Sequence, residues 1–152
     1  MKNILLSTMF LTICLGSCSG NKTNVNAVRI TDSGVINQNH LELLDSAGFS
    51  FLKINGRKIK GLHLKSPCFF VKTDGKIQHY SYHEVEVNNA IIIAGRVKGS
   101  ETSTYPACGN ATQGLLLKKD TALLINKVFE QSYTCPNSSL DEKNFWRIAH
   151  YK

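Results

Sequence analysis

The sequence contains one grouping of side chains whose types and spacing suit a metal ion. His79 and His83 lie four residues apart, and Glu84 follows directly. On a helix the two imidazoles would share one face, one turn apart, as in many zinc sites. On a strand they would also share a face but lie about 13 Å apart, because each residue advances the chain by about 3.3 Å. Nearby turn residues favour a strand, so we expect two exposed histidines, no metal site and no cofactor.

Cys68 could act as a catalytic nucleophile if a base lay beside it. Its neighbours Pro67 and Phe69 are apolar instead, and burial in apolar surroundings raises the pKa of a thiol and makes it inert. Asp141 and Glu142 could form a carboxylate pair, but both fit the first turn of a helix, where acidic residues are favoured. The sequence has no GxSxG, HExxH, CxxC or phosphate-binding glycine loop. Together these observations predict a protein that is not an enzyme.

A basic segment is the strongest candidate for a binding site. Five basic residues and no acidic residue lie between positions 53 and 65; they are Lys53, Arg57, Lys58, Lys60 and Lys65. Lys58 and Lys60 flank Ile59 and would share the strand face opposite it. We expect Arg57, Lys58 and Lys60 to contact an acidic partner. The alternative is a solvated hairpin tip that serves only solubility or edge protection.

Alternating apolar and polar residues predict a sheet of β-hairpins from Gly48 onward. The strongest signal is Asn55-Gly56, because both residues tolerate positive φ in a type I′ turn between two strands. Residues 115–117 and 122–125, on either side of Lys119-Asp120, favour a further hairpin, with one helix as the alternative. The other strand-like segments are residues 49–54, 57–64, 68–72, 77–82, 84–87 and 90–94. The last of these is apolar throughout, as expected of a strand covered on both faces.

A helix is predicted near the C-terminus. Ser139 and Glu142 have the spacing of a capping box, and the apolar face that follows ends near His150, with Trp146 at its edge and at least partly shielded. The residues of that face are Leu140, Phe145, Ile148 and Ala149. A weaker pattern of leucines predicts a helix over residues 38–47. The fold class is therefore mainly β (α+β), an antiparallel sheet of hairpins, sandwich- or barrel-like, with the C-terminal helix packed on it.

The first twenty residues have the features of an export signal. Lys2 precedes a largely apolar stretch over residues 4–13, which is too short to span a bilayer. The segment Leu15-Gly16-Ser17-Cys18 resembles the lipobox of bacterial lipoproteins. This resemblance implies cleavage before Cys18 and acylation of its thiol; the alternative is an ordinary cleaved signal. Ser19 stands where an aspartate would favour retention in the inner membrane, so it implies the outer membrane.

The lipobox divides the chain into three parts. Residues 1–17 are a signal peptide, residues 18–27 a lipidated flexible tether, and residues 28–152 a single globular domain. Acyl chains on Cys18, at about 0.8 kcal/mol per buried CH₂, would hold the domain durably on a membrane. The chain has 18 basic and 11 acidic residues, and this excess of positive charge suits an acidic partner. Nucleic acid is not expected as a partner outside the cell.

The cysteine count favours one disulfide. If Cys14 leaves with the signal and Cys18 carries lipid, Cys68, Cys108 and Cys135 remain in an oxidising compartment, and an odd count leaves one free thiol. The predicted hairpin around Lys119-Asp120 would bring Cys108 and Cys135 to the same end, so we favour that pair. A bridge from Cys68 to either of them, or no bridge, stays open.

These features predict a non-catalytic lipoprotein of the cell envelope, anchored by its lipid to the outer membrane and facing the periplasm. Its partners would be the membrane, through the lipid anchor, and an acidic envelope component or toxin protein. By analogy of class, inhibitors and immunity proteins against envelope-targeting toxins share this build. The alternative function is a structural or assembly accessory of an envelope complex, and a small enzyme is the least favoured.

Overall fold

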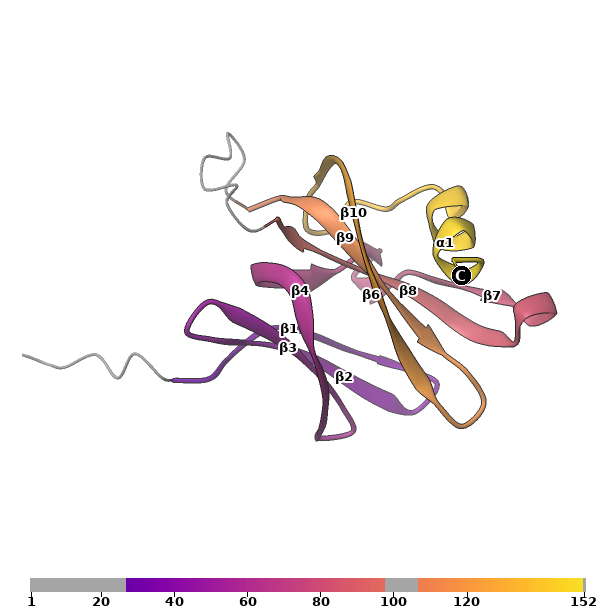
Figure 1. Cartoon of the computed structure of the whole chain (residues 1–152), viewed down its shortest axis with the longest axis horizontal. Helices are drawn as coiled ribbons and strands as arrows, with labels where there is room; N and C mark the ends of the chain where they lie inside the picture. Colours follow the sequence, from indigo (N-terminus) through magenta and orange to yellow (C-terminus); the bar gives the residue numbers. More distant parts are fainter. Residues whose placement is uncertain (1–26, 98–106, 152) are drawn as a thin grey trace, which may run out of the picture.

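The computed structural model describes residues 27–97 and 107–151 (Figure 1). The predicted signal peptide, nearly all of the predicted tether and residues 98–106 lie outside these ranges. The elements, in chain order, are β1 (Arg29–Ile36), β2 (Asn39–Ser46), β3 (Phe49–Ile54), β4 (Arg57–Phe70), β5 (Lys72–Thr73), β6 (Lys76–Ile77), β7 (His79–Tyr82), the 3₁₀ helix η1 (His83–Val85), β8 (Val87–Arg96), β9 (Gly109–Leu117), β10 (Ala122–Thr134) and α1 (Glu142–Ala149).

Strands β1 to β4 form an antiparallel meander joined by two-residue turns. Both residues of each turn have positive φ: 44° and 66° at Asn37-Gln38, 51° and 82° at Ala47-Gly48, and 50° and 76° at Asn55-Gly56. Positive φ at both central positions is the type I′ geometry, which matches the right-handed twist of the flanking strands. The hairpin predicted at Asn55-Gly56 is therefore confirmed.

The helix predicted over residues 38–47 is wrong, because strand β2 occupies most of this segment. Leu41 and Leu43 alternate with polar residues and are fully buried on the inner face of the sheet. Leu44 is buried as well, but it faces outward and lies opposite Phe51 of β3. The three leucines lie on both faces of a strand, and their spacing happens to match that of one helix face.

The main sheet has the strand order β1-β2-β3-β4-β8-β9-β10, with β7 also paired to β8, and all of its pairs are antiparallel. Strand β4 joins two halves of this sheet, one formed by β1 to β3 and the other by β8 to β10. Its residues up to Lys65 pair with β3, and those from Lys65 to Phe70 pair with β8. Pro67 has no N–H to donate, and it lies where the β4–β8 register shifts between Lys65 and Phe69.

Side chains of β1 reach the second half of β4 and bring the two halves of the sheet face to face. The Thr31 hydroxyl donates to the carbonyl of Cys68 at 2.7 Å, and the Asp32 carboxylate accepts from the N–H of Phe70 at 2.9 Å. The sheet does not close on itself, because β1 and β10 remain its two edges. The fold is mainly β and sandwich-like, and the barrel alternative is not the one adopted.

Two hydrophobic cores join three layers of structure. The first lies between the inner face of the β1–β4 meander and one face of β8 and β9, and the second lies between the other face of these strands and α1 (Figure 1). Strand β8 contributes to both: Ile91 and Ile93 belong to the first core, and Ile92 and Ala94 to the second. The prediction that residues 90–94 form a strand covered on both faces is confirmed.

The remaining predicted strands are confirmed in part. The turn predicted at residues 73–76 joins β5 and β6, with φ of 52° at Asp74 and 75° at Gly75. Strands β9 and β10 form the hairpin predicted around Lys119-Asp120, so the alternative of one helix there is wrong. The strand predicted at residues 84–87 is also wrong, because Glu84 and Val85 lie in η1, Glu86 ends η1 in a left-handed conformation, and β8 begins only at Val87.

Helix α1 begins later than the capping box predicts. Asp141, not Ser139, is the N-cap, and its carboxylate accepts from the N–H of Lys143 at 3.0 Å. The side chain of Gln78 accepts from the N–H of Leu140 and donates to the Leu140 carbonyl. This pair of hydrogen bonds holds the residue before the cap against the sheet, outside the helix.

The two aromatic side chains of α1 differ sharply in burial. Phe145 is fully buried in the second core, whereas Trp146 is 53 % exposed and stacks on His150 with 4.2 Å between the ring centroids. The helix also approaches β9 closely, because a Cβ added at Gly114 would collide with Ile148. Trp146 therefore lies at the rim of the helix packing, which Phe145 and Ile148 dominate.

We predict that Phe145→Ala lowers the free energy of unfolding by about 3–5 kcal/mol, because it leaves a cavity under the helix. Trp146→Ala should lower it by no more than about 1 kcal/mol, since a side chain at the rim loses little contact. Urea unfolding followed by circular dichroism measures both values. An equal loss for the two variants would contradict this packing of α1.

Candidate functional site

The basic hairpin predicted from the sequence lies at the β3–β4 turn. Arg57 and Lys58 are exposed, and Lys58 lies directly across the strand pair from Lys53. The ammonium nitrogen of Lys58 is 3.6 Å from the centroid of the Phe51 ring, which places it over the aromatic face. Among the described residues, Lys53 and Lys58 have no acidic partner. Their positive charges therefore remain available to a partner outside the domain.

A bulge in β4 alters the expected arrangement of the basic residues. Lys58 lies opposite Lys53, but Lys60 lies opposite Leu52, so Ile59 is an extra residue in the strand. The simple alternation that would place Lys58 and Lys60 on one face is interrupted at this bulge. The backbone of Lys60 is described, whereas its side chain is not, so the side-chain position predicted for Lys60 remains a prediction.

Apolar side chains from neighbouring strands surround the lysines, whereas the sequence alone predicted only the basic residues of this site. Ile30 lies opposite Leu44, which lies opposite Phe51, so these three share the outer face of the meander. Ile30 is 54 % exposed. A shallow cavity of about 170 Å³ on this face is lined by Val28, Leu44, Ser46, Phe51, Lys53 and Lys58.

We define the basic apolar face as the outward side chains of this region: Val28, Ile30, Phe49, Phe51, Lys53 and Lys58. The alternation of Phe49, Phe51 and Lys53 with the buried Ser50, Leu52 and Ile54 was a sequence signal for part of it. Val28 and Ile30 join this face because of how β1 pairs with β2 and β2 with β3. No local sequence pattern predicts that placement. The face combines exposed apolar surface with unpaired positive charge.

The histidines form no metal site with each other. His79 lies in β7, where its Nδ1 is 3.0 Å from the amide nitrogen of Asn89, and His83 begins η1. Within residues 27–97 and 107–151, no group of three or more histidine, cysteine, aspartate or glutamate side chains is placed to hold a metal ion. Asp141 caps α1 in place of the predicted Ser139, and Glu142 lies in the first turn, as the sequence predicts.

Cys68 is buried in the first core and is a free thiol. Its Sγ donates to the hydroxyl of Ser50 at 3.2 Å. Burial raises the pKa of the Cys68 thiol from 9.0 to about 11; the hydrogen bond with the Ser50 hydroxyl acts in the opposite direction, and the charge of Asp45 adds to the rise. The thiol is therefore neutral at physiological pH and unsuited to nucleophilic attack.

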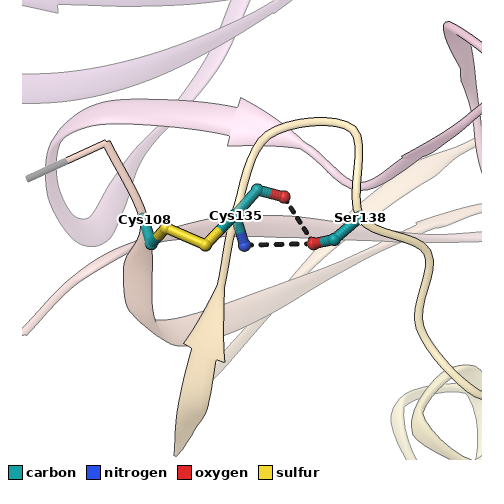
Figure 2. The surroundings of a disulfide bond; sticks show 3 residues. All are labelled: Cys108, Cys135 and Ser138. Atoms are coloured by element: carbon teal, nitrogen blue, oxygen red, sulfur yellow. Dashed lines mark hydrogen bonds between the residues drawn. A yellow bond between two sulfur atoms is a disulfide. The ribbon is translucent and has the colours of Figure 1, made fainter. Parts of the chain in front are cut away.

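Cys108 and Cys135 form a disulfide, which is the pairing that the sequence favoured (Figure 2). The bond joins the start of β9 to the end of β10 across a separation of 27 residues. The Ser138 hydroxyl accepts from the N–H of Cys135 at 3.0 Å and donates to its carbonyl at 2.5 Å, which fixes the turn after the bridge. In the chain-entropy model a loop of this length gives about 3.5 kcal/mol of stabilisation. Cys18, the predicted lipidation site, lies outside the described residues.

Comparison with protein-family models, with curated proteins and with solved structures found no match for this chain. The helix in the described ranges is too short to cross a membrane. The residues of this chain are therefore the basis for its function, and the basic apolar face and the predicted export signal are the most informative of them.

We predict that the Cys68 thiolate forms only near pH 11 in the folded protein. The test is the difference in ultraviolet thiolate absorbance between wild type and Cys68→Ala, which removes the contribution of the tyrosines. In urea the midpoint should fall to about 9, the ordinary value. Folding raises this pKa, so the neutral thiol contributes fully to the free energy of unfolding below pH 9. This contribution, roughly 2–3 kcal/mol, is lost as the pH rises through 11. A native midpoint near 9 would contradict burial of this thiol.

Proposed function

We propose that the protein is an envelope lipoprotein, anchored through Cys18, whose domain is a non-catalytic binding module for an acidic partner. The observation that carries this proposal is the basic apolar face, in which Lys53 and Lys58 have no ion-pair partner among the described residues. The resemblance of Leu15-Gly16-Ser17-Cys18 to a lipobox supports the anchor.

The composition of this face suits binding. The Phe51 ring holds the Lys58 ammonium group by a cation–π contact, which is worth about 0.5–1 kcal/mol at an exposed site. A side chain that is already ordered loses less conformational entropy when a partner binds. Exposed apolar side chains such as Phe49, which is 62 % exposed, mark interaction sites when they cluster. Headgroup phosphates and acidic proteins both offer the complementary charge, and a toxin bound by an immunity protein would be one such protein.

The anchor predicts that cells expressing the full chain incorporate radiolabelled palmitate into it, because acylation of Cys18 would supply the label. Cys18→Ala should abolish labelling. Cys68→Ala is the matched control and should retain it, since Cys68 is buried in the domain. Label that persists in Cys18→Ala, or none in the wild type, would disprove the anchor.

The binding site predicts a second outcome, for a variant with Arg57, Lys58 and Lys60 all changed to Glu. In affinity capture from envelope extracts, this variant should retain much less of any partner than the wild type does. Wild-type retention should also weaken with salt, because exposed charges are screened over about 8 Å at 0.15 M ionic strength.

The matched control reverses three exposed lysines on other elements, Lys76, Lys119 and Lys127. It has the same net charge as the hairpin variant and should bind like the wild type. Equal, salt-independent retention by all three proteins would show that the basic hairpin is only a solvated surface.

A further inference from the structure

We infer that the basic apolar face rests on the anionic surface of the bilayer to which the chain is anchored. The β1–β3 layer would then face the headgroups, and α1 would point away from them. This inference rests on the proposed function, because it names the acidic partner of the same hairpin and requires the anchor at Cys18. The reasons are the site at which the tether joins the domain, the exposed apolar side chains and the charge of the face.

The tether would join the domain at the edge of this face. Val28 lines the cavity beside Phe51 and Lys58, and nine residues separate it from Cys18. A flexible chain of that length has a root-mean-square span of about 15–18 Å and a fully extended reach of roughly 30 Å. Once Cys18 is fixed in the bilayer, the part of the domain held closest to the headgroups is the face that contains Val28.

The apolar side chains of the face are more exposed than a solvated surface requires. Val28 is 62 % exposed, Ile30 is 54 % exposed and Phe49 is 62 % exposed. Burying such side chains is worth about 25 cal/mol for each Å² removed from water. At a bilayer surface they can enter the boundary between headgroups and acyl chains. The neighbouring lysines can rest their aliphatic stems on the apolar surface and keep the ammonium groups at the level of the phosphates.

The charges near the face favour anionic lipid. Lys53 and Lys58 lie on it, and the exposed Arg57 lies at the adjoining turn. Two acidic residues are nearby. Asp45 is 3.6 Å from the guanidinium of Arg29, and Glu42, which lies across the strand pair from Lys53, has a carboxylate that is 19 % exposed and 4.0 Å from the imidazole of His40. Each lysine near an anionic surface contributes about 1 kcal/mol, which corresponds to about fivefold in binding. The tether's root-mean-square span of about 15–18 Å would keep this face close to the headgroups, so an acidic protein would have to compete with lipid for it, and lipid is the favoured partner.

The test places a single tryptophan on the face and asks whether lipid touches it. Trp146 is the one tryptophan of the chain, and it lies on α1, across β8 and β9 from the meander. The reporter protein carries Phe49→Trp together with Trp146→Phe, and the wild type, with Trp146, is the matched control. Both are purified as full acylated chains and reconstituted into phosphatidylcholine vesicles, with or without phosphatidylglycerol, that contain brominated lipid as a contact quencher.

We expect brominated lipid to quench the Phe49→Trp reporter, more strongly with phosphatidylglycerol, and to leave Trp146 of the wild type nearly unquenched. Adding Lys53→Glu and Lys58→Glu to the reporter should lower the ratio of docked to undocked protein by at least about 25-fold, since two attractions are lost and two repulsions gained. Cys68 should stay unreactive toward thiol reagents in every variant, which verifies folding. If Phe49→Trp exposes Cys68, Ile30→Trp replaces it as the reporter.

Three results would overturn the inference. The first is a reporter that remains unquenched although the protein floats with the vesicles; the anchored binding module would then stand, with an acidic protein as its partner. The second is equal quenching of the reporter and of Trp146, which would mean that the domain has no preferred orientation. The third is failure of the wild type to float with vesicles of either composition, which would also remove the anchor and with it the proposed function.

Discussion

The double pairing of strand β4 is the constraint on which the rest of the structure depends. This one continuous strand pairs with β3 along its first half and with β8 along its second half. The two halves of the sheet can then face each other, and the first core fills the space between them. Asp32 secures this arrangement because its carboxylate accepts from the N–H of Phe70 and from the ammonium group of Lys72, which lies 2.5 Å away.

The double pairing of β4 stacks the structure in layers, and these layers determine where a partner can bind. Strand β8 is covered on one side by the meander and on the other by α1, so its apolar residues are unavailable. The outer face of the meander differs, because Ile30 and Phe49 remain more than half exposed there. Lys53 and Lys58, which have no acidic partner among the described residues, lie beside them. The basic apolar face is therefore an outward surface at which exposed apolar side chains and positive charge coincide.

Local sequence signals predicted the features that depend on local chemistry. Asn55-Gly56 and Asp74-Gly75 form turns because their residues tolerate positive φ, and the apolar run around Ile92 forms a buried strand. The turns at Asn37-Gln38 and Ala47-Gly48 were missed because glutamine and alanine seldom adopt positive φ. The bulge at Ile59, the start of α1 and the approach of Val28 to the lysines depend on contacts between distant segments, which no single stretch of sequence contains.

The disulfide also determines how the chain responds to proteolysis. It closes the whole β9–β10 hairpin into a covalent ring. One cut in the exposed turn at Lys119-Asp120 would open this ring without releasing a fragment, because the sulfur bridge and the strand hydrogen bonds would keep both pieces in place. Under denaturing conditions the nicked protein would migrate as one species without reductant and as two fragments with it. A protease that attacks this turn would therefore leave the protein assembled.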